Sequence, residues 1–207
     1  MARFIIGSVA GLGRRRFLSM KVVGAILAGG FGSRFQGETH KLLAPFRGDT
    51  VVGHVLRAAR ESIIEEIAVV QGAIDLSGLV IEGETLLTNF DPRSGMASSL
   101  AIAVDWAKGV DCDHVVIGLG DQPLVLSESW TNLATAPAEA RLVVATYRGK
   151  RRNPVRIARD LFEQLPSTGE MGARMLMELH PELVLEVPCE GEPIDIDTVE
   201  ELSKWNL

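Results

Sequence analysis

The chain has 207 residues, of which 46% are hydrophobic and 23% are charged, and its formal net charge is −6. These values indicate one globular domain, because a chain of this length buries most of its unfolded surface. The negative charge argues against a protein whose main task is to bind nucleic acid. No apolar run approaches the ~20 residues of a membrane-spanning helix, so we expect no membrane partner.

The N-terminal stretch Met1–Ser19 differs from the rest of the chain. It carries Arg14–Arg16 after a mildly apolar start, which reverses the charge order of a signal peptide. We expect these residues to be an extension, disordered or derived from an upstream start codon, and residues 20–207 to form the domain. Cys112 and Cys189 form no CxxC pair, which predicts a reducing, cytoplasmic location without a disulfide framework.

Short apolar runs alternate with helical patterns along the domain. The predicted strands are Val22–Ala28, Glu66–Val70, Thr85–Thr88, His114–Leu119, Leu142–Thr146 and Leu183–Val187. The predicted helices are Val51–Glu61, Ser94–Lys108, Ser127–Ala136, Ala158–Leu165, Met171–Leu179 and Val199–Trp205. In the second helix, Met96, Leu100, Val104 and Ala107 recur three or four residues apart and predict one buried stripe. The alternation predicts a single α/β domain, with a mostly parallel sheet and helices on both faces.

A glycine-rich turn follows the first predicted strand. It contains Gly29–Gly30–Phe31–Gly32–Ser33, followed by Arg34 and then by Lys41. A buried strand that opens into such a turn presents several backbone N–H groups on one concave surface, which suits a phosphate chain. Arg34 and Lys41 add fixed cations. Because ligands of α/β sheets bind at the carboxyl ends of strands, we predict a nucleoside triphosphate site here.

A carboxylate ends another predicted strand. Asp121 follows the run Val115–Leu119 and stands two residues before Pro123, so it should project from the same sheet edge as the glycine turn. One carboxylate there is suited to Mg²⁺, which takes one or two carboxylates together with phosphate oxygens and water. The alternative is an ordinary turn aspartate before a proline. An upstream phosphate loop favours the metal.

Two aspartates alternate with isoleucines near the C-terminus, in Ile194–Asp195–Ile196–Asp197. Both carboxylates should therefore share one face of an extended segment, and one of them could reach the metal. The alternative is that Asp197 or Thr198 caps the last helix. Between the two motifs, Lys150–Arg152 is typical of a solvated edge and Asn153–Pro154 of a turn.

Five separated segments resemble the MobA-like NTP transferase family. They are LAGGFGSRF with KLL, PRSGMASSL, LGDQPLV, NPV with RDLF and GEMGAR, and DIDTVEEL. The resemblance extends from Met20 to about Leu202, and five agreeing segments are more specific than one glycine loop. Within the family, the sequence looks closest to the molybdenum cofactor cytidylyltransferases. The resemblance implies a nucleotidyltransferase on a Rossmann-like sheet of the GT-A type.

The resemblance also implies roles for individual residues. It implies NTP binding by Leu27, Ala28, Gly29, Gly30, Gly32, Ser33, Arg34, Lys41 and Ser99. It implies catalytic roles for Arg34, Lys41 and Asp121, and Mg²⁺ coordination by Asp121 and Asp197. It implies binding of a molybdopterin-type phosphate by Asn153, Pro154, Gly172 and Arg174.

Three segments depart from the family pattern. The usual Arg-Met-Gly after the loop is Arg34–Phe35–Gln36 here, the usual Gly-Asp is Gly169–Glu170, and the proline expected after Thr198 is absent. None of these changes removes an implied ligand. The altered Phe35–His40 stretch predicts a different course for the loop that carries Lys41.

The predicted reaction transfers a nucleoside monophosphate, CMP in preference to GMP, to the terminal phosphate of molybdopterin and releases pyrophosphate. A phosphate nucleophile is already ionised, so we expect His40, His54, His114 and His180 to be surface or structural residues. The implied protein partner is a molybdoenzyme that receives the product.

Four alternatives stay open. A GTP-dependent guanylyltransferase is one, since LAGG also occurs in such relatives. Transfer to a sugar or polyol phosphate is the second. A non-catalytic molybdopterin carrier is the third, which the presence of both Asp121 and Asp197 disfavours. A nicotinamide-binding protein fits least, because Gly29–Gly32 is not a GxGxxG motif.

Overall fold

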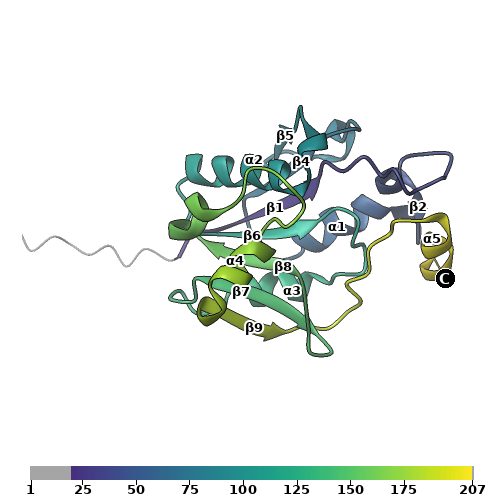
Figure 1. Cartoon of the computed structure of the whole chain (residues 1–207). Coiled ribbons are helices and arrows are strands. Elements are labelled where there is room, and N and C mark those ends of the chain that lie inside the picture. Colours follow the sequence, from purple (N-terminus) through teal and green to yellow (C-terminus); the bar gives the residue numbers. More distant parts are fainter. Residues whose placement is uncertain (1–19, 207) are drawn as a thin grey trace, which may run out of the picture.

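The computed structural model of the chain describes residues 20–206 (Figure 1), so the expected extension lies outside the described residues. Seven strands form one sheet in the order β5-β4-β1-β6-β8-β7-β9. The strands of this sheet are β1 (Val22–Ala28), β4 (Ile67–Gln71), β5 (Thr85–Thr88), β6 (His114–Leu119), β7 (Leu142–Tyr147), β8 (Lys150–Ala158) and β9 (Val184–Pro188). A separate two-stranded ribbon pairs β2 (Pro45–Phe46) with β3 (Asp49–Thr50).

The α-helices are α1 (Val51–Arg60), α2 (Met96–Gly109), α3 (Ser127–Ala134), α4 (Arg174–Leu179) and α5 (Val199–Trp205). Short 3₁₀ helices are η1 (Lys41–Leu43), η2 (Ser77–Leu79), η3 (Pro92–Ser94), η4 (Arg159–Gln164) and η5 (Pro181–Leu183). The helix predicted over Ala158–Leu165 is instead the 3₁₀ helix η4, which begins directly after β8 ends at Ala158. None of the helices in residues 20–206 is both long and apolar enough to cross a membrane.

Strand β8 is the antiparallel member of the sheet. β1 is parallel to β4 and β6, and β7 is parallel to β9, whereas β8 is antiparallel to both β6 and β7. The mostly parallel sheet is thus confirmed, and Lys150–Arg152 are exposed, as a solvated edge predicts. The interpretation of Asn153–Pro154 as a turn is wrong, because both residues belong to β8. The actual turn lies at Arg148–Gly149, both with positive φ, as a tight hairpin requires.

This reversal matters for the site. The chain enters β8 at the edge of the sheet where β1 and β6 end, so the first residues of β8 lie beside the carboxyl ends of the parallel strands. The register shifts between Val144 and Ala145, which leaves Asn153 and Pro154 as a bulge between Arg152 and Val155. Bulges of this kind redirect side chains next to functional sites.

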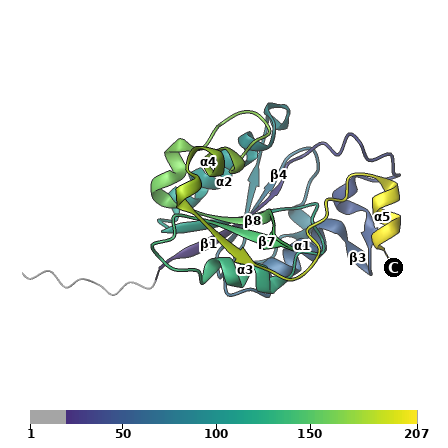
Figure 2. The ribbon, with the colours of Figure 1, turned by 60° about the horizontal axis from the view of Figure 1, so that its bottom comes forward.

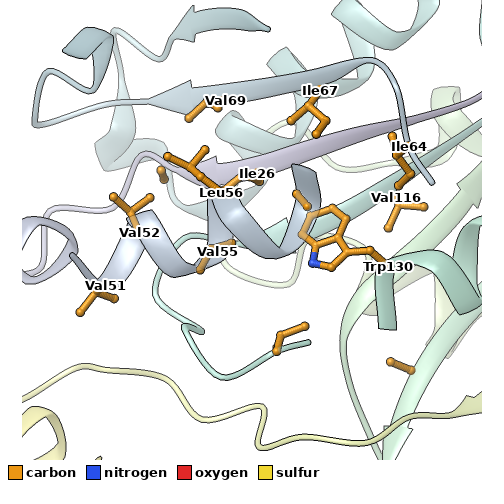
Figure 3. Close-up of a cluster of buried hydrophobic side chains, with 14 of the residues drawn as sticks. Ile26, Val51, Val52, Val55, Leu56, Ile64, Ile67, Val69, Val116 and Trp130 are labelled. Carbon is orange, nitrogen blue, oxygen red and sulfur yellow. The ribbon is translucent and has the colours of Figure 1, made fainter. Parts of the chain in front are cut away.

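Alternate side chains of the strands face two separate cores. Helices α1 and α3 cover one face and α2 and α4 the other (Figure 2), which confirms helices on both faces. Figure 3 shows the first core, where Ile26 of β1 lies near Leu56 of α1 and Trp130 of α3. The stripe predicted on α2 is buried at Leu100, Val104 and Ala107, but Met96 is 37% exposed because it begins the helix at the edge of the sheet.

The packing of Trp130 explains a glycine near the end of β6. Trp130 is 1% exposed, and a Cβ atom built on Gly118 would overlap its indole ring. Glycine at position 118 therefore lets α3 pack closely against β6. This close contact lies three residues before Asp121 in the sequence. The indole in turn supports the strand end from which Asp121 projects.

We expect Gly118→Ala to destabilise the protein by about 1–3 kcal/mol, because the added methyl group overpacks the core against Trp130. For a domain of this size the melting temperature should fall by roughly 2–4 °C per kcal/mol. Gly78→Ala is the matched control, since nothing lies within 4 Å of its Cβ position. Equal melting temperatures for the two variants would contradict this account.

Candidate active site

A cleft of about 590 Å³ opens where β1 and β6 end. It is bounded by the loop after β1, the start of α2, the segment after β6 and the first residues of β8. Most residues predicted for the site line this cleft together. They are Leu27, Gly29, Gly30, Gly32, Ser33, Arg34, Lys41, Ser99, Asp121, Asn153 and Asp197.

Lys41 joins the two aspartates predicted to hold a metal. Its Nζ atom lies 2.6 Å from Asp121 Oδ2 and 2.7 Å from Asp197 Oδ1. The other carboxylate oxygen of Asp197 lies 2.7 Å from Arg34 Nη2 in a salt bridge. The Lys41 side chain is 9% exposed, whereas that of Arg34 is 74% exposed. The predicted cations and the predicted metal ligands thus form one ion-pair cluster at the bottom of the cleft.

The charge state of Lys41 follows from this cluster. Burial alone would lower the pKa of its ammonium group, but the Asp121 and Asp197 carboxylates outweigh burial and raise the pKa above its usual range. Lys41 is therefore charged throughout the neutral pH range, and its pairing stabilises the folded state there. This contribution is lost as the pH rises through the raised pKa of Lys41.

The C-terminal segment brings Asp197 to the cleft by an extended course. Ile196 is fully buried, and its backbone N–H donates to the carbonyl of Asp121 at 2.9 Å. Asp195 and Asp197, on either side of Ile196, both line the cleft, as their alternation predicts. Thr198 caps α5 and forms a capping box with Glu201. The predicted metal ligand Asp197 and the helix cap Thr198 are therefore neighbouring residues.

His40 supports the glycine loop, which bears out a structural role for this histidine. Its Nε2 atom lies 3.1 Å from the carbonyl oxygen of Gly30, and Nδ1 accepts from the Leu42 N–H at 3.3 Å. These partners fit the neutral ring with the proton on Nε2. Burial, together with the nearby Lys41 charge, lowers the pKa of His40 and favours that neutral form. His40 ends the Phe35–His40 stretch, which departs from the family pattern, and its hydrogen bonds connect the glycine loop to η1.

Ser99 lies under the glycine loop. Its side chain is largely buried and accepts a hydrogen bond from Asn89 Nδ2 at 2.9 Å. A Cβ atom on Gly29 would meet the Ser99 hydroxyl, so the loop needs glycine to approach α2 this closely. Asn89 was not among the predicted site residues. Its position directly after strand β5 is the sequence feature that could have indicated it.

Four predicted site residues do not line the cleft among the described residues. Ala28 is 2% exposed and packs in the core. Pro154 and Gly172 are buried, and the Gly172 backbone lies against Met96. Arg174 is exposed and pairs with Glu178 at 3.1 Å on its own helix. Their assigned roles in binding stay predictions.

Several cleft residues were not predicted. Gln122 donates from Nε2 to Asp195 Oδ1 at 2.9 Å. Partial removal from solvent in the cleft, with repulsion from Asp121 as a further cause, raises the pKa of Asp195. Arg152 lines the cleft from the first half of β8, and Glu170 lines it beside the start of α2, where its Oε2 accepts from the Met96 N–H at 3.4 Å. Arg152 was not among the residues predicted from the sequence, because strand β8, which carries it to the cleft, was not predicted either.

The donor set suits a divalent cation that keeps part of its water shell. In residues 20–206, no group of three or more His, Cys, Asp or Glu side chains is arranged to hold a metal. Asp121 and Asp197 instead share one cation, the Lys41 ammonium group. Mg²⁺ is bound in this way, by one or two carboxylates with phosphate oxygens and water. The two carboxylates therefore fit a metal that arrives with a nucleotide.

The fold and the cleft define a Rossmann-like α/β protein of the nucleotidyltransferase class. The family model described as the MobA-like NTP transferase domain matches residues 24–184. The match covers well over half of the chain, and the chain belongs to this family.

Solved structures share the fold. Rv0371c from Mycobacterium tuberculosis H37Rv has a TM-score of 0.76 at 23% identity, covering 90% of this chain and 98% of that chain, and it has also been solved in complex with manganese. A cytidylyltransferase from Leptospira borgpetersenii has a TM-score of 0.64 at 20% identity, covering 88% of this chain and 84% of that chain.

The curated relatives are longer proteins. The bifunctional protein GlmU of Alkaliphilus metalliredigens is 30% identical over 157 residues, which are 73% of this chain and 34% of GlmU. The chain therefore spans about a third of the length of this relative.

We expect Lys41→Met to lower the free energy of unfolding by about 1.5–3 kcal/mol without divalent cations, because it leaves two carboxylates without their shared ammonium group. Millimolar Mg²⁺ or Mn²⁺ should then raise the melting temperature of the variant more than that of the unaltered protein, since Lys41 no longer competes for the carboxylates. Lys204→Met on α5 is the control, because Lys204 is exposed, lies over the Trp205 ring and forms no ion pair within residues 20–206. Equal gains in all three proteins would contradict a metal site at Asp121 and Asp197.

Proposed function

We propose that this chain is a metal-dependent cytidylyltransferase that transfers CMP from CTP to the terminal phosphate of a molybdopterin-type acceptor and releases pyrophosphate. The observation that carries the proposal is the Lys41 ammonium group between Asp121 and Asp197, directly beside the glycine loop. Nucleotidyl transfer asks a protein mainly for positioning and charge neutralisation, and this cluster supplies both.

The triphosphate would bind along the glycine loop. Backbone N–H groups of Gly29–Ser33 are suited to its oxygens, and Arg34 and Lys41 would neutralise its charge. Arg34 is mostly exposed and held by one carboxylate. Such exposed ion pairs are weak, so the guanidinium group can turn from Asp197 to a phosphate at little cost.

Asp121 and Asp197 would hold Mg²⁺. Once bound, the ion would neutralise the developing charge on the phosphate oxygens. Lys41, released from the carboxylates, would then stabilise the departing pyrophosphate. Asp121 and Asp197 would therefore exchange the Lys41 ammonium group for Mg²⁺, and their negative charge would stay neutralised.

The chemical step is an in-line displacement. An acceptor phosphate oxygen forms a bond to the α-phosphorus of CTP, the bond from that phosphorus to the bridging oxygen breaks, and pyrophosphate leaves with the electron pair. The attacking phosphate is already ionised, so the protein need not remove a proton. This agrees with the cleft, which has no histidine among the described residues that line it.

CTP is preferred in this proposal because the KLL, GMASSL and NPV…GAR segments look more like those of cytidylyltransferases, and one structural neighbour is described as a cytidylyltransferase. A molybdoenzyme would receive the product. The similarity to GlmU supports a second candidate, transfer of a nucleotide to a sugar phosphate. Both candidates use a phosphate acceptor.

The choice of nucleotide can be tested by thermal shift. We expect CTP with Mg²⁺ to raise the melting temperature more than GTP, ATP or UTP does. A ligand at about 100 times its Kd adds about 2.7 kcal/mol, which is roughly 5–10 °C here. A shift with GTP and none with CTP would exclude the cytidylyltransferase, and no shift with any nucleotide would contradict the enzyme itself.

We expect Asp121→Asn to reduce pyrophosphate release at least a hundredfold while the protein stays folded, because the amide is a poor ligand for Mg²⁺. The assay uses CTP and Mg²⁺ with molybdopterin in one arm and N-acetylglucosamine 1-phosphate in the other. Asp105→Asn is the control, since Asp105 is 76% exposed on α2 and pairs only with Lys108. Near-normal turnover by Asp121→Asn would remove Asp121 from the metal site.

A further inference from the structure

Arg152 lies on the side of the cleft opposite the glycine loop. The sheet order places β6 between β1 and β8, so Asp121, after β6, stands between the loop after β1 and the first half of β8. Because β8 is antiparallel, Arg152 and Asn153 reach the same edge as Asp121, and both line the cleft. The cleft therefore has two sides, with the aspartates between them.

Arg152 differs from the other cations of the cleft. Arg34 and Lys41 are both bonded to the aspartates. The exposed guanidinium group of Arg152 donates only to the backbone carbonyl of Arg151, at 3.0 Å, and has no carboxylate partner within residues 20–206. Its charge is thus free to meet a ligand.

The neighbouring Arg151 shows that an arginine without a carboxylate partner is not a general feature of β8. Arg151 Nε lies 2.7 Å from Glu186 Oε1 on β9, and Arg151 is not among the residues that line the cleft. Successive residues of a strand point to opposite faces. The chain therefore offers two neighbouring arginines, one paired away from the cleft and one unpaired in it.

We propose that Arg152 binds the attacking phosphate of the acceptor and so selects acceptors that carry a terminal phosphate monoester. This inference rests on the function proposed above and assigns its acceptor side. Two phosphate groups repel each other as they approach, and Arg34 and Lys41 stand on the triphosphate side. Arg152 is the cleft cation placed to neutralise the second phosphate, and its planar guanidinium group can donate two parallel hydrogen bonds to it.

The arrangement also fixes the direction of attack. A phosphate held by Arg152 reaches the region of Asp121 from the β8 side, while the pyrophosphate leaves toward the glycine loop. The attacking and leaving oxygens then lie on opposite sides of the α-phosphorus, as an in-line displacement requires.

The test titrates phenyl phosphate, a minimal phosphate monoester, into the protein saturated with α,β-methylene CTP and Mg²⁺, and measures binding by calorimetry. We expect Arg152→Gln to weaken this binding about tenfold or more, because a charge-assisted contact is lost, and Arg152→Lys to restore part of it. Arg151→Gln is the matched control and should bind as the unaltered protein does. Benzyl alcohol, which lacks the phosphate, should not bind at the same concentrations.

The outcomes separate this inference from the proposed function. If the nucleotide analogue shifts the melting temperature of all variants equally but Arg152→Gln binds phenyl phosphate normally, Arg152 has no acceptor role and the nucleotide site stands. Equal losses in Arg151→Gln and Arg152→Gln would also overturn it, since they would indicate a general charge effect. If no nucleotide shifts even the unaltered protein, the proposed function fails, and this inference fails with it.

Discussion

The shared ion pairs of Lys41 are the constraint on which the cleft depends. One ammonium group bonds two carboxylates that lie 80 and 156 residues further along the chain. Two aspartates this close repel each other unless a cation lies between them, and the ammonium group meets that need. The same requirement supports the proposed metal site, because a divalent cation with its phosphate ligands would replace the ammonium group without leaving the carboxylates uncompensated.

The backbone holds this cluster from both sides. His40 ties the glycine loop to η1, which carries Lys41, and the Ile196 N–H ties the C-terminal segment to the carbonyl of Asp121. The reversed direction of β8 then adds a second wall. A sheet with only parallel strands would bring carboxyl ends alone to this edge, whereas here the start of an antiparallel strand brings Arg152 there as well. In the proposed reaction, the two walls would hold the nucleotide and the acceptor on separate sides.

The sequence predicted the parts of the site that depend on local pattern. The apolar run of β1, the glycine loop and the alternation of Asp195 and Asp197 around Ile196 all have the predicted arrangement, because strand periodicity and turn glycines act over a few residues. Strand β8 was missed because its first residues are charged and its bulge contains a proline. Its place in the sheet therefore depends on backbone contacts with β7, its hairpin partner, and with β6, which lies further away in sequence. Residues that such contacts bring to the cleft, Arg152 and Glu170 among them, give no local signal.

The charges of the cleft favour a phosphate over a hydroxyl group as the acceptor. A hydroxyl nucleophile has to lose a proton and needs a base of suitable pKa within reach. No histidine is among the described residues that line the cleft, and the Asp195 carboxylate, whose pKa is raised, accepts a hydrogen bond from Gln122. A phosphate needs no base but brings negative charge, which has to be neutralised opposite the triphosphate. Arg152, which has no carboxylate partner within residues 20–206, supplies that neutralisation in the proposed reaction, whereas a hydroxyl acceptor would leave its charge without a partner.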